Sequence, residues 1–225
     1  MQKFFNITSE TEHVVKIELV NGKKHNPLSI ELIKQLKNSL IQISSQKKVK
    51  VLIISSEGPG FSAGHDLDEL RKNKNNKKFF NELFNECSNL MQTIINLPQP
   101  VIAEVCGIAA AAGCQLVASC DLAVASEQAS FMTPGVNIGL FCSTPMVAVS
   151  RNLSRKKIME MLLTGEKLSA KDAVDFGLIN YCVPLDQLHQ KTLSLANIIA
   201  SKPISTVKIG KEAFYKQVEM PIDEA

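Results

Sequence analysis

Short apolar runs alternate with amphipathic stretches along the first half of the chain. Each run has the length of a single strand, whereas the stretches between the runs repeat apolar residues at helical spacing. This alternation predicts a largely parallel sheet, because parallel neighbours need a long crossover connection between them. The predicted strands are residues 14–20, 49–55, 100–105 and 122–125.

The helical pattern is clearest after residues 25–29 (HNPLS). Ser29 has the side chain of a helix N-cap, and apolar residues then recur at intervals of three and four. These positions predict a helix with one buried face, made of Ile30, Ile33, Leu36, Leu40 and Ile43.

Beyond residue 125 the pattern changes to helices joined by short turns. Because the predicted strands come first in the chain and the predicted helices come last, a strand-rich core with an appended helical segment is favoured over a plain doubly wound sheet. The predicted helices are residues 156–164, 169–176, 185–200 and 203–218.

Two of the predicted strands run into loops of small residues, within 55–70 (SSEGPGFSAGHDLDEL) and 100–121 (PVIAEVCGIAAAAGCQLVASCD). Where bulky side chains are missing, the backbone itself can approach a ligand, and amides at a helix start carry partial positive charge. Two such donors that converge form an oxyanion hole, which stabilises the anion formed when a carbonyl becomes an enolate. The alternative is that the small residues serve only tight helix–sheet packing.

The polar residues near these loops offer hydrogen-bond donors but few proton carriers. Asp66 and Glu69 have capping-box spacing, which predicts a helix start that aims the preceding amides into a pocket. His65 either titrates near neutrality or contributes only its N–H. Gln115 lies on the first turn of the next apolar helix and can bind a carbonyl or a water, but it cannot take up a proton. Residues 131–140 (FMTPGVNIGL) are predicted to be a loop, and they contain no carboxylate.

Composition limits the class of protein. The chain has 225 residues, 45% of them hydrophobic, which suits one large domain or one and a half. Its 25 basic and 22 acidic residues are too balanced to indicate nucleic acid or an anionic membrane as a partner. The N-terminus lacks a signal-peptide pattern, and no window has the apolar length of a membrane span. We therefore expect a soluble cytoplasmic protein, with the mitochondrial matrix as the alternative.

Three further groups of residues carry weaker signals. The six cysteines include no CxxC pair, so buried reduced thiols are favoured over disulfides or a zinc site, and no metal is expected. The basic run 71–78 (RKNKNNKK) is either a solvated loop or frayed helix, or a contact for phosphate. His13, His25 and His189 show no partner pattern and are expected at the surface.

Together these segments resemble the crotonase, or enoyl-CoA hydratase/isomerase, superfamily over essentially the whole chain. Within it, the chain is most similar to hydratase-domain-containing proteins that share AAAGCQ and TPGVNxGLFC. The motifs, in chain order, are NPLS at 26–29, FSAGHDL at 61–67, PVIA at 100–103 leading to Gly107 and AGC, Cys120-Asp121, LTG at 163–165, Ser169-Ala170, and Ala173 with Gly177-Leu178.

The resemblance implies an α/β fold, a spiral of strand–strand–helix (ββα) turns with a C-terminal helical segment that builds homotrimers or homohexamers. It places the spiral core at residues 1–183 and the helical segment at 184–225, whose last helix is expected to be incomplete. The implied ligand is an acyl-CoA or enoyl-CoA thioester. CoA is then part of the substrate, and no separate cofactor is expected.

The same likeness implies roles for residues of the two loops. The thioester oxygen is expected to bind the backbone N–H groups of His65 and Ala112, so that their amides matter more than their side chains. The CoA moiety is expected to lie along the first motif. The residues implied to contact it are Ala63, Gly64, Asp66, Leu67 and Gly113.

The chain departs from the family in its acid–base residues. Typical hydratases use two glutamates to add water beside the thioester, and this chain has Gln115 and Gly135 at those positions. Each such group is worth roughly 10²- to 10⁴-fold in rate, so most hydration should be lost even with the oxyanion hole intact.

Three functions therefore remain open. The leading hypothesis is an acyl-CoA enzyme of the enoyl-CoA hydratase/isomerase type that stabilises a thioester enolate. The second is a catalytically silent acyl-CoA-binding or regulatory protein. The third is an acyl-CoA decarboxylase, because loss of CO₂ generates the enolate without a base.

Overall fold

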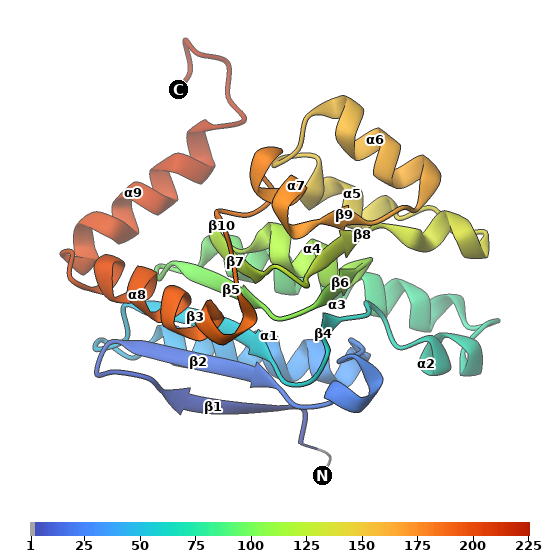
Figure 1. Cartoon of the computed structure of the whole chain (residues 1–225), viewed down its shortest axis with the longest axis horizontal. Coiled ribbons are helices and arrows are strands. Elements are labelled where there is room, and N and C mark those ends of the chain that lie inside the picture. Colours follow the sequence, from blue (N-terminus) through green and yellow to red (C-terminus); the bar gives the residue numbers. More distant parts are fainter. Residues whose placement is uncertain (1–2) are drawn as a thin grey trace.

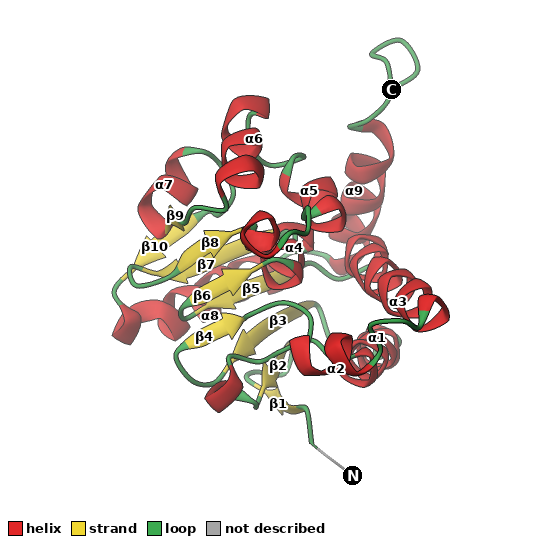
Figure 2. Ribbon diagram, turned by 90° about the vertical axis from the view of Figure 1, so that its right-hand side faces the viewer, coloured by secondary structure: helices red, strands yellow, loops and turns green. Residues whose placement is uncertain are grey.

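The computed structural model describes residues 3–225, which form two sheets surrounded by helices (Figures 1 and 2). In the larger sheet all neighbours are parallel except β1 and β2, and in the smaller sheet all are parallel except β8 and β9. The larger sheet has the order β1 (Phe5–Ser9), β2 (Val14–Leu19), β3 (Val51–Ser56), β5 (Val101–Val105), β7 (Leu122–Ser126), β10 (Tyr181–Val183). The smaller has the order β4 (Gly60–Ser62), β6 (Ile108–Ala110), β8 (Ser130–Met132), β9 (Leu168–Ser169).

The chain winds repeatedly from the larger sheet to the smaller one. Each of β3, β5 and β7 is followed directly by a short strand of the smaller sheet, namely β4, β6 and β8, and then by helical structure. Because β4, β6 and β8 are parallel neighbours, the segments that leave them emerge at one edge of the smaller sheet. This edge positions the candidate site.

The helices cover both faces of the larger sheet. They are α1 (Ile30–Ser44), α2 (Leu67–Lys72), α3 (Lys77–Asn96), α4 (Ala112–Ser119), α5 (Ser143–Val149), α6 (Arg155–Thr164), α7 (Ala170–Asp175), α8 (Leu188–Ala200) and α9 (Ile204–Gln217), with short 3₁₀ turns η1 (Gly22–Lys24), η2 (Pro134–Ile138) and η3 (Leu185–Gln187). Figure 2 shows α1 and α3 side by side on one flank of the molecule.

Successive side chains of β3 point to opposite faces of the larger sheet, so the strand contributes to a separate hydrophobic cluster on each face. Leu52 and Ile54 belong to the main cluster with the apolar face of α1, whereas Val51 and Ile53 pack with Leu188 on α8. A strand buried on both sides reads as a continuous apolar run, which is the pattern seen in this part of the sequence. The four predicted strands are confirmed as β2, β3, β5 and β7.

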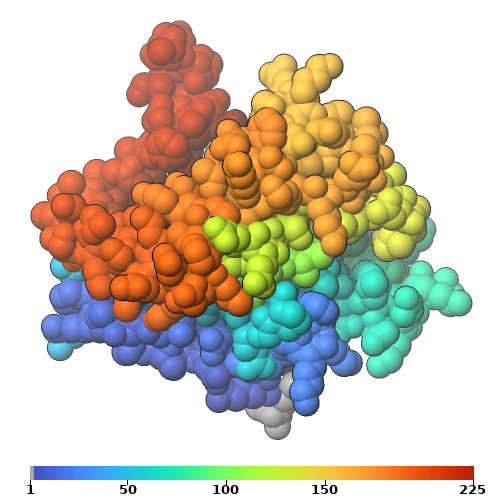
Figure 3. All heavy atoms as spheres, viewed as in Figure 1, coloured from blue at the N-terminus to red at the C-terminus, as the bar shows by residue number. Residues whose placement is uncertain are grey.

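The predicted helices are also present, with small shifts at their ends. Ser29 caps α1 as expected, because its Oγ accepts a hydrogen bond from the Leu32 N–H at 3.2 Å. The C-terminal helices α6 to α9 are all formed, and α9 projects from the body of the molecule (Figures 1 and 3). Residues 131–140 differ from the predicted loop, since they complete β8 and then form η2.

Two histidines, His13 and His189, have hydrogen-bond or ion-pair partners that the sequence did not indicate. His189 on α8 is half-exposed, and its ring lies between two carboxylates, with Nε2 3.2 Å from Glu10 Oε2 and Nδ1 3.1 Å from Glu104 Oε2. His13 Nδ1 lies 3.0 Å from the Lys48 carbonyl oxygen. His189 is exposed and His13 is partly exposed, in keeping with the expected surface positions, and their partners lie 35 or more positions away along the chain, so no local pattern indicates them.

Candidate functional site

The two small-residue loops touch each other where they leave β4 and β6. A Cβ atom added to Gly113 would lie 2.4 Å from the Ser62 carbonyl oxygen, and one added to Gly64 would lie 3.1 Å from the Ala112 nitrogen. Gly64 also has φ +88°, a conformation that side chains strongly disfavour. The glycines thus allow the backbones of the two loops to lie in direct contact.

The geometry leaves the amides of His65 and Ala112 free. The Leu28 N–H donates to the Gly64 oxygen at 2.8 Å, and the Asp66 N–H donates to the Leu28 oxygen at 3.3 Å, so the intervening His65 N–H points away from Leu28. Ala112 is the first residue of α4, where an amide has no intrahelical acceptor. Among residues 3–225, neither amide donates to another group.

The backbone turns sharply between β6 and α4 at Ala111, which has φ 48° and ψ −118°. This conformation is sparsely populated by residues other than glycine. It is held on both sides, because the Ala111 N–H donates to the Met132 oxygen at 2.9 Å and its carbonyl accepts from the Gln115 N–H at 3.0 Å. Backbone strain of this kind concentrates at functional sites, where it fixes the direction of neighbouring groups.

Replacing Ala111 with glycine should relieve this strain. The strained conformation costs the folded state about 1–3 kcal/mol. Glycine gives the unfolded chain more conformational entropy than alanine does, which lowers the stability by about 0.4–1 kcal/mol. We therefore expect Ala111→Gly to raise the free energy of unfolding by about 1 kcal/mol. Urea denaturation followed by circular dichroism measures it. Ala110→Gly, at a neighbouring buried position with negative φ, should instead lower the stability. Equal losses in both variants would contradict the account of Ala111.

Asp66 starts α2 as predicted. Its Oδ1 accepts hydrogen bonds from the Asp68 N–H at 2.9 Å and the Glu69 N–H at 3.2 Å. The Glu69 carboxylate does not complete a capping box by accepting from the Asp66 N–H, because Glu69 Oε2 accepts from the Ile30 N–H at 3.0 Å and the Asp66 N–H donates to the Leu28 oxygen. Glu69 therefore ties α2 to the start of α1, and its burial raises the pKa of the carboxyl.

The remaining residues of the first motif differ in exposure. Ala63 and Leu67 are exposed, whereas Gly64 is buried, as is Gly113 in the second loop. The basic run 71–78 spans the end of α2, a short link and the start of α3, and nearly all of it is exposed. This agrees with a solvated segment.

His65 carries a side chain that is buried without a polar partner. Neither ring nitrogen makes a hydrogen bond, and the ring packs edge-on against Phe84 of α3, with 5.5 Å between the centroids. Burial lowers the pKa of this histidine, and the nearby Leu28 carbonyl opposes the shift only in part. The imidazole is therefore neutral at pH 7.

The lowered pKa predicts a pH dependence of stability. An unfolded histidine gains its proton near pH 6.5, while the folded ring stays neutral to lower pH, so the stability present above pH 6.5 should fall as the pH drops below it. The slope attributable to one histidine has an upper bound of about 1.4 kcal/mol per pH unit. Urea denaturation between pH 7 and 5 should show this slope for wild type and for His13→Gln, but a flatter one for His65→Phe. An unchanged slope in His65→Phe would refute the assignment.

The two positions expected from the resemblance to replace the family's glutamates are Gln115 and Gly135, and neither carries a carboxylate. Gln115 is only 5% exposed, and its Oε1 is buried without a hydrogen-bond partner. At Gly135, a Cβ would lie 2.8 Å from the Leu140 oxygen and 2.9 Å from Cys142 Sγ, and the Gly135 N–H donates to that sulfur at 3.3 Å. The space that a side chain at 135 would use is therefore occupied.

Thr133 is a polar residue of this region that the sequence analysis missed. It is fully buried between β8 and η2, and its Oγ1 has no hydrogen-bond partner. A threonine before a proline is common in turns, so nothing in the local sequence marks this hydroxyl as unpaired.

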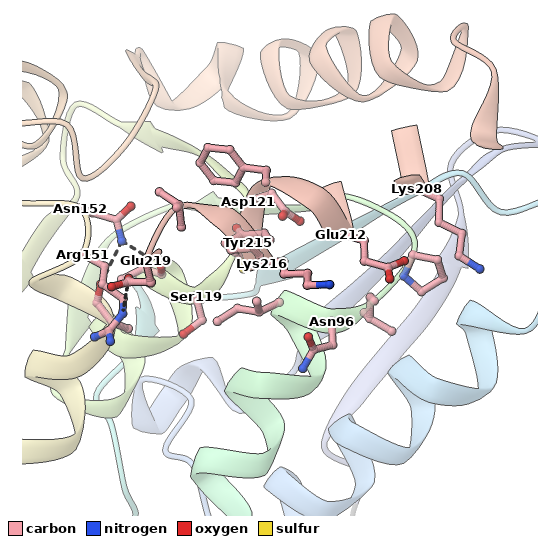
Figure 4. A pocket seen from close by; sticks show the side chains of 18 residues that line it. Asn96, Ser119, Asp121, Arg151, Asn152, Lys208, Glu212, Tyr215, Lys216 and Glu219 are labelled. Atoms are coloured by element: carbon pink, nitrogen blue, oxygen red, sulfur yellow. Dashed lines mark hydrogen bonds and ion pairs between the residues drawn. The ribbon is translucent and has the colours of Figure 1, made fainter. Parts of the chain in front are cut away.

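A cavity of about 790 Å³ lies elsewhere, at the C-terminal end of α4. Figure 4 shows the side chains that line it, which include Lys208, Glu212 and Tyr215 of α9. Its labelled side chains include the ion pair between Arg151 Nε and Glu219 Oε1, at 3.0 Å. None of the residues named above for the two loops lines it. The carbonyl chemistry predicted from the sequence therefore does not belong to this cavity.

Most of the cysteines are buried, as expected. All six are free, four of them are buried, and burial raises the pKa of Cys87 to about 12. Within residues 3–225, no three His, Cys, Asp or Glu side chains gather closely enough to hold a metal ion. In the same part of the chain, no helix combines the length and apolar character needed to cross a bilayer.

A spiral of strand–strand–helix turns, whose short strands end in two touching glycine-containing loops, defines the crotonase class of fold. A crystal structure of an enoyl-CoA hydratase from Mycobacterium smegmatis matches with a TM-score of 0.96 and 40% identity, covering 99% of this chain and 86% of that one. The crystal structure of human enoyl coenzyme A hydratase domain-containing protein 3 matches with a TM-score of 0.95 and 46% identity, covering 99% and 87%.

The sequence comparisons agree. A family model described as enoyl-CoA hydratase/isomerase matches residues 9–225. The mitochondrial enoyl-CoA hydratase domain-containing protein 3 of Homo sapiens is 48% identical over 96% of this chain and 71% of its own length. The short-chain-enoyl-CoA hydratase of Clostridium acetobutylicum is 30% identical over 98% of this chain and 85% of its own length. The chain belongs to the enoyl-CoA hydratase/isomerase family.

Proposed function

We propose that this protein binds acyl-CoA thioesters and polarises the thioester carbonyl with the backbone amides of His65 and Ala112. The observation that carries the proposal is the contact between the two loops, which leaves both amides without an internal acceptor. Donors that are fixed before the ligand arrives stabilise developing negative charge without reorganisation. An enolate on the thioester oxygen would therefore be stabilised here.

The CoA moiety would lie along the first loop. Under this proposal it contacts Ala63, Gly64, Asp66 and Leu67, together with Gly113 of the second loop. Ala63 and Leu67 are exposed and available for such contacts. CoA arrives as part of the ligand, so the proposal includes no separate cofactor. The functional assembly would be a homotrimer or a homohexamer.

Hydration is not the activity that these residues favour. Gln115 cannot carry a proton, and the neutral His65 ring has no partner that would orient it as a base. Without two positioned carboxylates, we expect the hydration of crotonyl-CoA to be slower by roughly 10⁴-fold or more than in a glutamate-containing relative. What remains is binding and enolate stabilisation, which suits either a thioester enzyme that needs no base, such as a decarboxylase, or a silent acyl-CoA-binding protein.

The second of these is favoured by one specific observation. The volume that a catalytic side chain at residue 135 would need is filled by the Leu140 carbonyl and by Cys142 Sγ. A chain that repacks this position has replaced its acid–base group with a structural contact. The enoyl-CoA hydratase domain-containing protein 3 of several animals is named as mitochondrial, so of the two compartments expected from the sequence, the matrix is the one we propose.

The proposal is tested by comparing two ligands that differ only in the carbonyl. Butyryl-CoA should bind at least tenfold more tightly than S-butyl-CoA, the thioether that lacks the carbonyl oxygen. Each hydrogen bond from a backbone N–H to that oxygen contributes about 1 kcal/mol to the binding free energy. Titration calorimetry measures both affinities. At a hundredfold excess over Kd, butyryl-CoA should also stabilise the fold by about 2.7 kcal/mol. Equal affinities would refute the oxyanion role, and no binding of either would refute the proposed function.

A variant supports the same test from the protein side. Ala112→Pro removes one of the two amide donors, at the first position of α4, and should weaken the binding of butyryl-CoA by about fivefold while the affinity for the thioether is unchanged. Arg155→Pro makes the same change at the first position of α6, after an extended residue, and should bind both ligands as the wild type does.

A further inference from the structure

The helix that presents the Ala112 amide is held at its other end by a buried ion pair. α4 is eight residues long, so its two ends lie about 12 Å apart. All of its residues except Ala118 are buried. Because protein interiors are close-packed and transmit strain, a helix enclosed in this way shifts as a unit when one end moves. The contacts at the C-terminal end of α4 therefore bear on the amide at its N-terminal end.

Asp121, two residues beyond the last residue of α4, fixes that end against the larger sheet. Its N–H donates to the Val101 carbonyl oxygen at 3.0 Å, and its Oδ2 accepts from the Val101 N–H at 2.7 Å. Val101 is the first residue of β5, which lies between β3 and β7. Two hydrogen bonds thus tie the end of the helix to the start of a central strand.

Lys211 of α9 completes this arrangement. Its Nζ lies 2.7 Å from Asp121 Oδ2, and it also donates to the carbonyl oxygens of Ile94, in the last turn of α3, and of Gln99. All three donors of the ammonium group are therefore paired, which fixes its place. Hydrogen bonds between ionised groups are short and strong. The two side chains are 7% and 14% exposed, so salt screens this pair only weakly.

We propose that Lys211 and Asp121 are positioning residues for the oxyanion hole: they fix the C-terminal end of α4 and thereby set where the Ala112 amide lies. The inference rests on the proposed function, because the place of this amide matters only if it binds the thioester oxygen. Neither side chain contacts the ligand. Hydrogen bonds from N–H to oxygen need a separation of about 2.7–3.2 Å, so a small shift of α4 is enough to weaken the bond.

The test compares butyryl-CoA with S-butyl-CoA by titration calorimetry, at a temperature well below the melting temperature of each variant. In Lys211→Met, the affinity for butyryl-CoA should fall by about fivefold, which corresponds to one amide bond, while that for the thioether stays unchanged. A purely structural role would lower the melting temperature and leave the ratio of the two affinities as it is in the wild type.

Asp121→Asn gives a milder form of the same change, in case Lys211→Met does not fold. The asparagine keeps an oxygen that can accept from the Val101 N–H, but it removes the charge that holds Lys211. We expect the ratio of the two affinities to fall in this variant too.

Val14→Ala is the matched control for loss of stability. Val14 is fully buried in β2 and packs with the cluster beside α8, whereas the buried apolar residues of α4 belong to the cluster on the opposite face of the larger sheet. The smaller side chain should lower the melting temperature and leave the ratio of the two affinities unchanged.

The outcomes separate the inference from the function on which it rests. If the wild type binds butyryl-CoA no more tightly than the thioether, the proposed oxyanion role fails and the inference fails with it. If the wild type shows the preference and both variants keep it, the inference alone is refuted. If Val14→Ala loses the preference as well, the effect follows from destabilisation in general, and the positioning role is again refuted.

Discussion

Replacing Gly113 with alanine should separate the two oxyanion loops and remove acyl-CoA binding. The new methyl group would lie 2.4 Å from the Ser62 carbonyl oxygen and 2.8 Å from Ser62 Cβ, so backbone must move. Overpacking of this kind costs about 1–3 kcal/mol. A shift of one loop breaks the convergence of the two amides and also displaces the proposed CoA contact at Gly113, so we expect the affinity for butyryl-CoA to fall by about a hundredfold. Calorimetry and urea denaturation measure the two effects.

The chain provides a matched glycine for comparison. Gly210 lies in α9 with no atom within 4 Å of an added Cβ. Gly210→Ala should stabilise the protein slightly, since alanine is favoured over glycine by about 1 kcal/mol in a helix, and should leave ligand binding unchanged. If Gly113→Ala bound butyryl-CoA like the wild type, the two loops would not form a common site.

Replacing Lys211 with methionine should cost about 3–5 kcal/mol of stability, the range for breaking a buried ion pair by removing one partner. Lys211 Nζ lies 2.7 Å from Asp121 Oδ2 and donates to the carbonyl oxygens of Ile94 at 3.0 Å and Gln99 at 3.1 Å. The two side chains are 7% and 14% exposed. Methionine would leave the Asp121 carboxylate and two carbonyls without this donor, and α9 buries no residue that could replace the contact. Urea denaturation followed by circular dichroism measures the loss.

Lys208→Met serves as the control for this effect. Lys208 is an exposed lysine of α9 (Figure 4), so its replacement should change the stability by less than about 0.5 kcal/mol. The double variant Asp121→Asn/Lys211→Met should lose less stability than the sum of the losses in the two single variants. Each single variant leaves one buried charge unpaired, whereas the double variant removes both charges. A loss below about 1 kcal/mol for Lys211→Met would show that the pair does not anchor α9.

The features that were predictable from the sequence are local ones. Ser29 and Asp66 cap their helices through atoms two or three residues away, and the apolar run of β3 identifies a strand buried on both faces. The small residues of the two loops predict that backbone approaches backbone, and Gly64 and Gly113 do so. In each case the physical cause lies within a few residues of the position it affects.

The features that escaped prediction depend on partners far along the chain. Glu69 accepts from Ile30 instead of its own helix start, His189 meets Glu10 and Glu104, and Lys211 reaches Asp121 across 90 positions. Thr133 was missed because an unpaired hydroxyl is defined by what surrounds it. The division between residues 1–183 and 184–225 stays a prediction, and α8 packs directly against the larger sheet.

A crystal structure of the protein with butyryl-CoA tests the central claim most directly. We expect the thioester oxygen to lie within about 2.7–3.1 Å of both the His65 and the Ala112 backbone nitrogens. A thioester carbonyl bound elsewhere, or held by only one of these nitrogens, would contradict it.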